Sequence, residues 1–290
     1  MGVLNRTPDS FSDGGAYVDE DAAARRAREM LDQGADILDV GAESTRPGAP
    51  QIADEEQIAR LGDTIRRAVA EGAIVSIDTT SPAVAAHAIG QGASIVNCVD
   101  PGRAAELGEL AARRGASLVI MHCRGSMTAM RGFSAAADAT YDDVVADVAR
   151  ELSASAQRAT AAGLEREEIV LDPGFGFAKN ARHSIALAAS LGSIVALGFP
   201  VLVGPSRKSF LAHAAAAEER AAGRPGELAP AAQRLGGTIA AVLACAARGA
   251  RIARVHDVAE ARQALGVWSA IVRADRGSAR PSAAMEVGRA

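Results

Sequence analysis

The sequence predicts an α/β protein built as a single-domain (β/α)8, or TIM, barrel. Eight short apolar runs recur along the chain, nearly all ending on a polar or charged residue, and Ala-rich stretches with helical spacing separate them. Continuous apolar runs of this kind are typical of strands buried on both faces of a parallel sheet. Active sites of such barrels lie at the C-terminal ends of the strands. The polar groups there are therefore candidates for one site: Asn5, Asp39, Asp78, Asn97, His122, Asp172, Arg254 and His256.

The strands are expected where the apolar runs lie, and the helices in the Ala-rich stretches between them. Strands are predicted over about residues 1–5, 36–41, 73–78, 94–97, 116–121, 168–171, 200–204 and 250–255. Helices are predicted over about residues 20–34, 54–71, 102–114, 141–162, 180–197, 230–248 and 258–273, with one more starting at Ser81-Pro82. Asp19 or Asp21 can cap the first helix and Gly34 can end it, while a serine before a proline is a typical helix start.

The ends of the domain follow from the same pattern. Residues 212–229 are predicted to be an insertion or an extra short helix. The barrel is expected to span residues 1–274. Residues 275–290 have little apolar content, so we expect a disordered tail there.

Composition and charge exclude several classes of protein. A formal net charge of −4 leaves no basic surplus for a nucleic-acid backbone. The chain shows no apolar run long enough for a membrane span and no secretory signal. Its three cysteines lack metal-binding spacing, which indicates a reducing compartment. The sequence therefore predicts a cytoplasmic protein that binds neither nucleic acid nor membrane.

Lysine is scarce in this chain. Lys179 and Lys208 are the only two lysines, and arginine supplies the other 29 basic side chains. A bias toward arginine codons accounts for most of this pattern, yet both lysines fall in glycine-rich segments at strand ends. Lys208 is compatible with a surface lysine, a hydrogen-bond donor to a bound heterocycle or a Schiff-base nucleophile.

One side of the expected site suits an anion. Arg254 and His256 alternate along the last strand, so their side chains face the same way. Asn5 ends the neighbouring first strand, and barrels often bind phosphate near their last strands. A guanidinium beside an imidazole is suited to a phosphate or diphosphate group.

The other side is rich in buried carboxylates. Asp78 and Asp172 end apolar runs, where an unpaired charge is costly. Such a carboxylate can accept two hydrogen bonds from an amidine-like edge, as in a pterin or guanine. Asn97 can both donate and accept beside it.

Some roles stay open on the residues alone. Asp39 can be a structural group in the barrel interior, and His256 can be a structural histidine. His122 is equally compatible with a place in the pocket and a structural role. The polar loops at residues 6–17 and 43–51 either fold over a ligand or are ordinary solvated turns.

Eight segments, in order, resemble the motifs of the dihydropteroate synthase family. They are residues 1–15, 43–48 (Glu-Ser-Thr-Arg-Pro-Gly), 76–79, Asn97, 121–125, 171–179, 206–210 and 254–258. One such motif is weak, but eight in the family's order span almost the whole chain and are highly specific. The resemblance implies the TIM-barrel fold and a transferase. In its reaction the amine of 4-aminobenzoate displaces diphosphate from 6-hydroxymethyl-7,8-dihydropterin diphosphate and gives 7,8-dihydropteroate for folate biosynthesis.

The resemblance also implies roles for particular residues. Those expected to bind the pterin are Asp78, Asn97, Asp172 and Lys208, with Arg254 against its ring. Those expected to hold the diphosphate are Asn5, Arg254 and His256, with a magnesium ion at Asn5. Those expected to form the aminobenzoate site are Phe11, Thr45, Arg46, Pro47, Lys208 and Ser209. The chemistry would rest on Lys208, Arg254, His256 and Asp172. The family further implies a homodimer and a target of sulfonamides.

Three positions depart from the family pattern. Arg6 stands where an apolar residue is common, Ala42 where glycine is usual, and Cys98 where an acid is usual. None of them removes a residue assigned to substrate contact. Arg6 and Cys98 leave a catalytically silent pterin-binding paralogue as one alternative. A pterin-dependent methyltransferase and an aldolase that uses Lys208 are the others.

Overall fold

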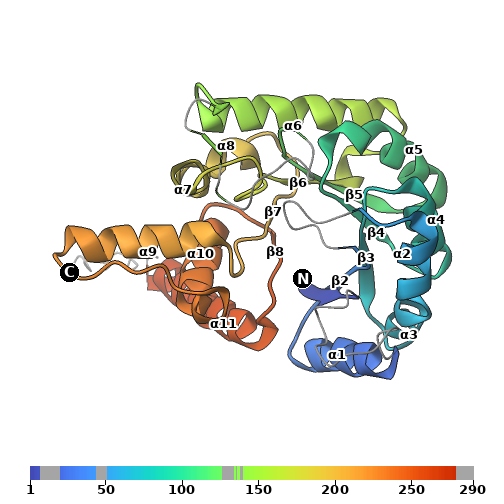
Figure 1. The fold of residues 1–290 in the computed structure, drawn as a ribbon, viewed down its shortest axis with the longest axis horizontal. Coiled ribbons are helices and arrows are strands. Elements are labelled where there is room, and N and C mark those ends of the chain that lie inside the picture. Colours follow the sequence, from blue (N-terminus) through green and yellow to red (C-terminus); the bar gives the residue numbers. More distant parts are fainter. Residues whose placement is uncertain (7–19, 44–50, 126–133, 135, 138–139, 279–290) are drawn as a thin grey trace, which may run out of the picture.

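A closed barrel of parallel strands forms the centre of the molecule (Figure 1). The computed structural model describes residues 1–6, 20–43, 51–125, 134, 136–137 and 140–278. Six strands pair in sequence order: β1 (Gly2–Asn5), β2 (Ile37–Gly41), β3 (Ile74–Asp78), β4 (Ile95–Cys98), β5 (Ser117–Met121) and β6 (Ile169–Asp172). β7 (Leu202–Val203) pairs in parallel with β8 (Ile252–Ala253). All of these pairs are parallel, so the strand C-termini share one end of the barrel.

Two single bridges close the ring. Leu171 in β6 bridges Val201 before β7, and Gly2 in β1 bridges Val255 after β8. Backbone hydrogen bonds of 3.0 Å from Val3 N to Val255 O and 2.9 Å from Leu171 N to Pro200 O complete the two joints. The predicted (β/α)8 barrel is confirmed, although its last two strands are shorter than expected.

The helices surround the strands, as the Ala-rich spacing predicts (Figure 1). They are α1 (Glu20–Asp32), α2 (Asp54–Leu61), α3 (Thr64–Ala70), α4 (Pro82–Gly90), α5 (Ala104–Arg114), α6 (Val144–Ala161), α7 (Ala181–Ala189), α8 (Gly192–Val195), α9 (Ser209–Ala221), α10 (Leu235–Ala247) and α11 (Val258–Ser278). Ser81 caps α4 through a hydrogen bond from Val84 N, so that predicted start is confirmed. No helix in the described part of the chain is both long and apolar enough to cross a membrane.

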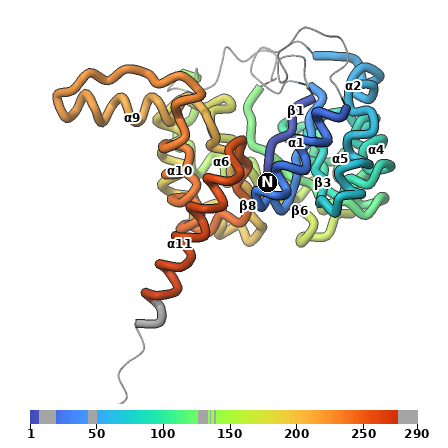
Figure 2. Tube along the Cα trace, turned by 90° about the horizontal axis from the view of Figure 1, so that it is seen from below, coloured from blue at the N-terminus to red at the C-terminus, as the bar shows by residue number. Residues whose placement is uncertain are grey.

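Four predicted helices differ from the observed ones. The helix expected over 54–71 is interrupted at Gly62, whose φ of 47° ends α2 before α3 begins. The helix expected over 180–197 is divided between α7 and α8. The extra helix expected within 212–229 is α9, which starts earlier and projects away from the barrel (Figure 2). The last helix, expected over 258–273, continues to Ser278.

The core lies between the barrel and the helices. Strands β2, β3, β5 and β6 each contribute a fully buried residue to one apolar cluster shared with the surrounding helices: Leu38, Val75, Leu118 and Leu171. A smaller cluster of Val119, Val170 and Leu202 fills part of the barrel interior side. Strand residues alternate between the two faces of the sheet, so one cluster packs against the helices and the other lies inside the barrel. Close packing on both faces holds the strand ends, and the polar groups on them, in fixed positions.

Candidate active site

Arg254 joins three of the predicted strand ends. It follows β8, and its Nε lies 2.6 Å from Asp39 Oδ2 on β2 while its Nη2 lies 2.8 Å from Asp78 Oδ2 on β3. Asn97, on β4, donates from Nδ2 to the same Asp39 oxygen at 3.1 Å. Asp39 Oδ2 is therefore the acceptor that Arg254 and Asn97 share. The sequence alone left the role of Asp39 open between a structural group and a site residue.

Burial and the neighbouring opposite charges shift the pKa values of Arg254 and Asp78 in opposite directions. Burial opposes a charge on Arg254, but Asp39 and Asp78 outweigh it and raise the pKa of the guanidinium. Burial raises the pKa of Asp78 to about 7, and Arg254 only partly offsets this effect. The Oδ1 atoms of Asp39 and Asp78 are buried and accept no hydrogen bond from the described residues. Asp78 thus has an acceptor atom available to a ligand.

Asp172 and Lys208 form a second pair of charges at the same end of the barrel. Asp172 ends β6, and its Oδ1 accepts a hydrogen bond of 2.7 Å from Gly174 N. Burial raises the pKa of Asp172 while the charge of Lys208 lowers it. Burial lowers the pKa of Lys208 to about 8. Lys208 Nζ also lies 4.3 Å from the centroid of the Phe177 ring, a cation–π contact.

Glycine makes room between the two groups. A Cβ at Gly204, after β7, would lie 3.9 Å from both Lys208 Nζ and Arg254 Cβ. A Cβ at Gly41 would lie 3.5 Å from Asp78 Cβ and 3.8 Å from Asn5 Oδ1. Asn5, on β1, is therefore next to Asp78, and Lys208 is next to Arg254. Because glycine has no Cβ, these two positions place no side chain against the charged groups.

His256 is held at the edge of the site by a serine. Its Nδ1 lies 2.9 Å from Ser206 Oγ, and its backbone N–H donates to the same oxygen at 3.2 Å. Ser209 is the first residue of α9 and donates to Ser134 Oγ at 3.1 Å. Of the remaining predicted contacts, Phe11, Thr45, Arg46 and Pro47 lie outside the described residues.

His122 contacts Glu151 and Lys179 and is not part of the cluster of Arg254, Asp39 and Asp78. It follows β5, with Nε2 2.9 Å from Glu151 Oε2 and Nδ1 2.9 Å from Lys179 Nζ. Phe177 was missed by the sequence reasoning. The signal that could have found it is Gly174-Phe175-Gly176-Phe177, in which two aromatic residues alternate with glycines soon after β6.

The three unusual positions each lie near the site. Arg6 is 2% exposed, and its Nε donates to Arg60 O at 2.8 Å. Ala42 is buried after β2. Cys98 ends β4, donates to Asp100 O at 3.1 Å, and burial raises its pKa to about 12. Cys98 is therefore a neutral thiol in place of the charge the family pattern carries there.

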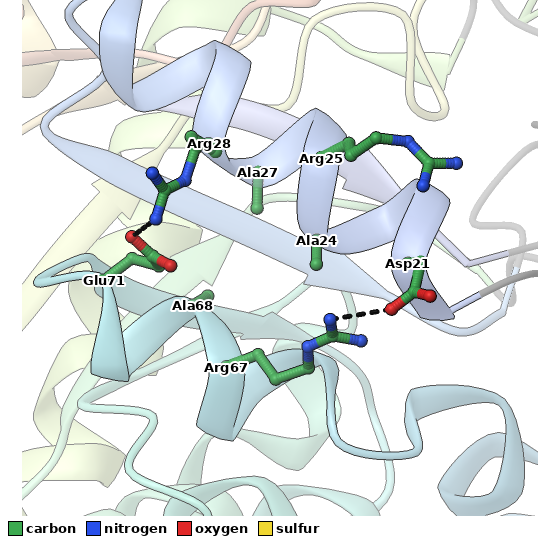
Figure 3. Close-up of a pocket in the computed structure, with 8 residues that line it drawn as sticks. All are labelled: Asp21, Ala24, Arg25, Ala27, Arg28, Arg67, Ala68 and Glu71. Carbon is green, nitrogen blue, oxygen red and sulfur yellow. Dashed lines mark hydrogen bonds and ion pairs between the residues drawn. The ribbon is translucent and has the colours of Figure 1, made fainter.

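A separate hollow of about 290 Å³ lies on the outer helical layer, between α1 and α3 (Figure 3). Ion pairs join Arg67 to Asp21 and Arg28 to Glu71 across it. Its position on the outside of the barrel separates it from the strand C-termini, and its charges are largely paired with one another. We do not assign the candidate active site to this hollow.

The chain matches known proteins along most of its length. A family model described as "Pterin binding enzyme" matches residues 1–256. The dihydropteroate synthase of Mycobacterium leprae is 42% identical over 92% of both chains. A crystal structure of dihydropteroate synthase from Thermus thermophilus in complex with 4-aminobenzoate is 43% identical over 93% of both chains, with a TM-score of 0.77.

Further solved structures extend this likeness. The Thermus thermophilus enzyme in complex with 6HMPPP is 41% identical over 93% of both chains, with a TM-score of 0.74. A Yersinia pestis dihydropteroate synthase with a sulfonamide drug is 35% identical over 94% of both chains, with a TM-score of 0.80. Fold and site thus define a barrel enzyme of the pterin-binding class. Within that class, the chain belongs to the dihydropteroate synthase family.

Proposed function

We propose that this protein joins 4-aminobenzoate to 6-hydroxymethyl-7,8-dihydropterin diphosphate and releases diphosphate. The observation that carries this proposal is the buried cluster of Arg254, Asp39, Asp78 and Asn97 facing the Asp172–Lys208 pair at one end of the barrel. The relatives in complex with 4-aminobenzoate and 6HMPPP support the choice of substrates. In the reaction a C–N bond forms at the pterin methylene, the C–O bond to diphosphate breaks, and the amine loses a proton.

The carboxylates suit the donor edge of the pterin. Asp78 offers a buried Oδ1 with no partner among the described residues, and Asp172 keeps Oδ2 for a ligand while Oδ1 holds Gly174. Asn97 can donate and accept beside them. Lys208 would donate to a ring acceptor of the pterin from beside the Phe177 ring. Because a buried polar group without a partner is costly, a ligand with matching groups gains both affinity and specificity.

The cationic groups suit the leaving group. As the C–O bond breaks, negative charge grows on the diphosphate oxygens. Arg254, fixed by two carboxylates, can stabilise that charge without moving. His256, held by Ser206, and Asn5 complete the proposed diphosphate side. The attacking aromatic amine is neutral at pH 7, so the mechanism requires no strong base.

Magnesium fits this side through one protein ligand. Mg²⁺ is commonly held by one or two protein oxygens together with substrate phosphates and water. Asn5 is partly exposed at the end of β1, and both its Oδ1 and Asp78 Cβ lie within 4 Å of a Cβ built at Gly41. When bound there, Mg²⁺ would neutralise part of the diphosphate charge. The described residues contain no group of three or more His, Cys, Asp or Glu that could hold the ion without substrate.

The proposal extends to assembly and location. We propose a homodimer, because α10 carries no charged side chain and packs against α11, whose residues Val267 and Ile271 are 57% and 63% exposed. We also propose a cytoplasmic location, since Cys98, Cys123 and Cys245 are free thiols, as in a reducing compartment.

Diphosphate release by the purified protein tests the proposed function. We expect release to require the pterin diphosphate, 4-aminobenzoate and Mg²⁺ together, with dihydropteroate formed in equal amount. Complementation of a strain that lacks the synthase checks the same activity in cells. Release without 4-aminobenzoate would overturn the proposal, because it would indicate hydrolysis of the pterin diphosphate. Pterin binding without any product would also overturn it and would favour a silent pterin-binding paralogue.

A further inference from the structure

Lys179 is the fully buried lysine that the proposed chemistry does not use. It is one of two lysines in a chain with 29 arginines, and its side chain is 0% exposed. A buried ammonium group is costly unless several acceptors surround it. Its position, next to the turn that follows β6, places it behind the wall of the candidate active site.

Four acceptors surround the Lys179 ammonium group. Its Nζ donates to the backbone oxygens of His122 at 3.2 Å, Gly174 at 3.1 Å and Phe177 at 3.0 Å. The fourth neighbour, at 2.9 Å, is Nδ1 of His122. These contacts tie the end of β5 to the turn at residues 173–178. Burial lowers the pKa of Lys179 to about 7, while the nearby Asp172 carboxylate raises it.

The tied turn carries two groups of the proposed pterin site. Asp172 O accepts from His122 N at 2.8 Å, and Asp172 Oδ1 accepts from Gly174 N at 2.7 Å. Phe177, at the other end of the turn, contacts Lys208 Nζ. The turn itself is strained, since the non-glycine residue Ala178 has a φ of 49°. A strained turn keeps one shape only where surrounding contacts hold it.

His122 and Glu151 orient the ammonium group. Burial and the charge of Lys179 lower the pKa of His122 to about 3, so its ring is neutral. Its Nε2 faces the Glu151 carboxylate at 2.9 Å, which places the ring proton on that nitrogen and leaves Nδ1 as an acceptor. Arg124 pairs with Glu151 and holds the carboxylate in turn. The chain of contacts therefore runs from Glu151 on α6 to Lys179.

We propose that Lys179 is a positioning residue for the pterin site. It fixes the turn at residues 173–178 so that the Asp172 carboxylate and the Phe177 ring keep their places opposite Lys208. The inference rests on the proposed function, because it concerns how the same site recognises the pterin. It assigns no contact between Lys179 and substrate. The diphosphate side, made of Asn5, Arg254 and His256, lies on other strands and does not depend on this turn.

Two variants test the role. Lys179→Met keeps the length of the side chain and removes its donors, and Glu151→Gln changes the partly exposed partner that orients His122. Calorimetry would measure binding of the pterin diphosphate and, separately, of inorganic diphosphate with Mg²⁺.

For Lys179→Met we expect pterin diphosphate affinity to fall about tenfold or more, and inorganic diphosphate affinity to stay within about twofold. For Glu151→Gln we expect a smaller loss of the same kind. Glu109→Gln, which removes an exposed ion pair to Arg113, is the control and should change neither.

The outcomes separate the inference from the proposed function. If the unaltered protein binds no pterin diphosphate, the proposed function fails. If it binds and turns over, but the Lys179 variant matches it or loses both affinities together, the positioning role is wrong. Should Lys179→Met fail to fold, Glu151→Gln decides: selective loss of pterin diphosphate affinity supports the role, and any other result contradicts it.

Discussion

At the scale of single residues, the site is built from charges that the protein pairs before any substrate arrives. Arg254 bridges Asp39 and Asp78, and Asp172 lies within the field of Lys208. Each carboxylate retains one oxygen outside its hydrogen bond to Arg254 or Gly174. The site is thus organised in advance, and substitutions that keep shape but change one atom should be informative.

Replacing Asp172 by asparagine tests the pterin contact. Asp172→Asn can keep the hydrogen bond from Gly174, but it presents an amide N–H where the ligand also presents a donor. A buried donor without a partner costs about 1–3 kcal/mol, so pterin affinity should drop by about tenfold or more. Calorimetry checks the affinity, and thermal unfolding checks that the fold is kept. Equal affinity in the variant would contradict a direct contact.

Replacing Arg254 by lysine tests stabilisation of the leaving group. Arg254→Lys keeps one positive charge but loses the planar fork that reaches Asp39 and Asp78 together. Because leaving-group charge is greatest in the transition state, kcat should fall by more than KM for the pterin diphosphate rises. Steady-state kinetics measures both. An increase in KM alone would limit Arg254 to ground-state binding, and Arg251→Lys, at an exposed neighbouring position, should change neither constant.

The raised pKa of Asp78 predicts how the free energy of unfolding depends on pH. Its pKa in the folded protein is about 7, above the ordinary value of 3.8, so between these values the folded state holds a proton that the unfolded chain releases. The contribution of Asp78 to stability is therefore present at low pH and is lost as pH rises toward 7. Urea unfolding should show that the free energy of unfolding falls with pH less steeply in Asp78→Asn than in the unaltered protein. Parallel curves would show that Asp78 does not titrate in this range.

Sequence reasoning placed most of the candidate site residues at strand ends because a strand end is a local feature. Asp78, Asn97, Asp172 and Arg254 lie where the apolar runs placed them. It could not decide between the two roles of Asp39, because the partners of a strand residue come from neighbouring strands. It also missed Phe177, since an aromatic side chain in a turn carries no periodic signal. The predicted contacts at residues 11 and 45–47 stay predictions.

At the scale of elements, glycines set where helices stop and turns bend. Apolar periodicity continued through residues 54–71, so the sequence predicted one helix, yet Gly62 divides it into α2 and α3. The strand pattern was more reliable because apolar runs bounded by polar residues fit a buried parallel sheet. β7 and β8 are shorter than their runs because the flanking residues Val201 and Val255 make only single bridges.

Gly174 provides a test at this scale. It has a φ of 66°, and a Cβ there would lie 2.1 Å from His122 O. Gly174→Ala should therefore destabilise the protein by at least about 1–3 kcal/mol through backbone strain and that clash. Gly192→Ala is the matched control, because no atom lies within 4 Å of its added Cβ and it begins α8. Urea unfolding compares the two, and equal stabilities would show that the turn adapts freely.

At the scale of the whole molecule, part of α11 presents apolar side chains that no other described residue covers. Residues 264–272 of α11 carry no charge, and Val267 and Ile271 of this helix are exposed. The helix itself lies beside α10 (Figures 1 and 2). Exposed patches of this kind mark interfaces between proteins. The proposed occupant is a second copy of the chain.

Charge on this face should separate the two copies. In sedimentation velocity, we expect the unaltered protein to be a dimer and the double variant Val267→Asp, Ile271→Asp to be a monomer, because an interface would have to bury the new carboxylates without partners. Ile74→Asp, at an exposed residue of β3, should leave the dimer intact. A monomer before any substitution, or a dimer after it, contradicts this interface.

The way the ring is closed has a consequence for how the chain folds. β1 through β6 pair with sequence neighbours, but Gly2 must meet Val255, almost the full length of the chain away. During synthesis the six-stranded sheet can assemble first, whereas this joint waits until the last strand has left the ribosome. The joint is a single bridge, whereas the strands from β2 to β5 pair over at least three residues each, so fewer backbone contacts hold it. Its amide hydrogens should exchange with solvent sooner than those of β2 to β5, so the barrel would open along the same line at which it was last closed.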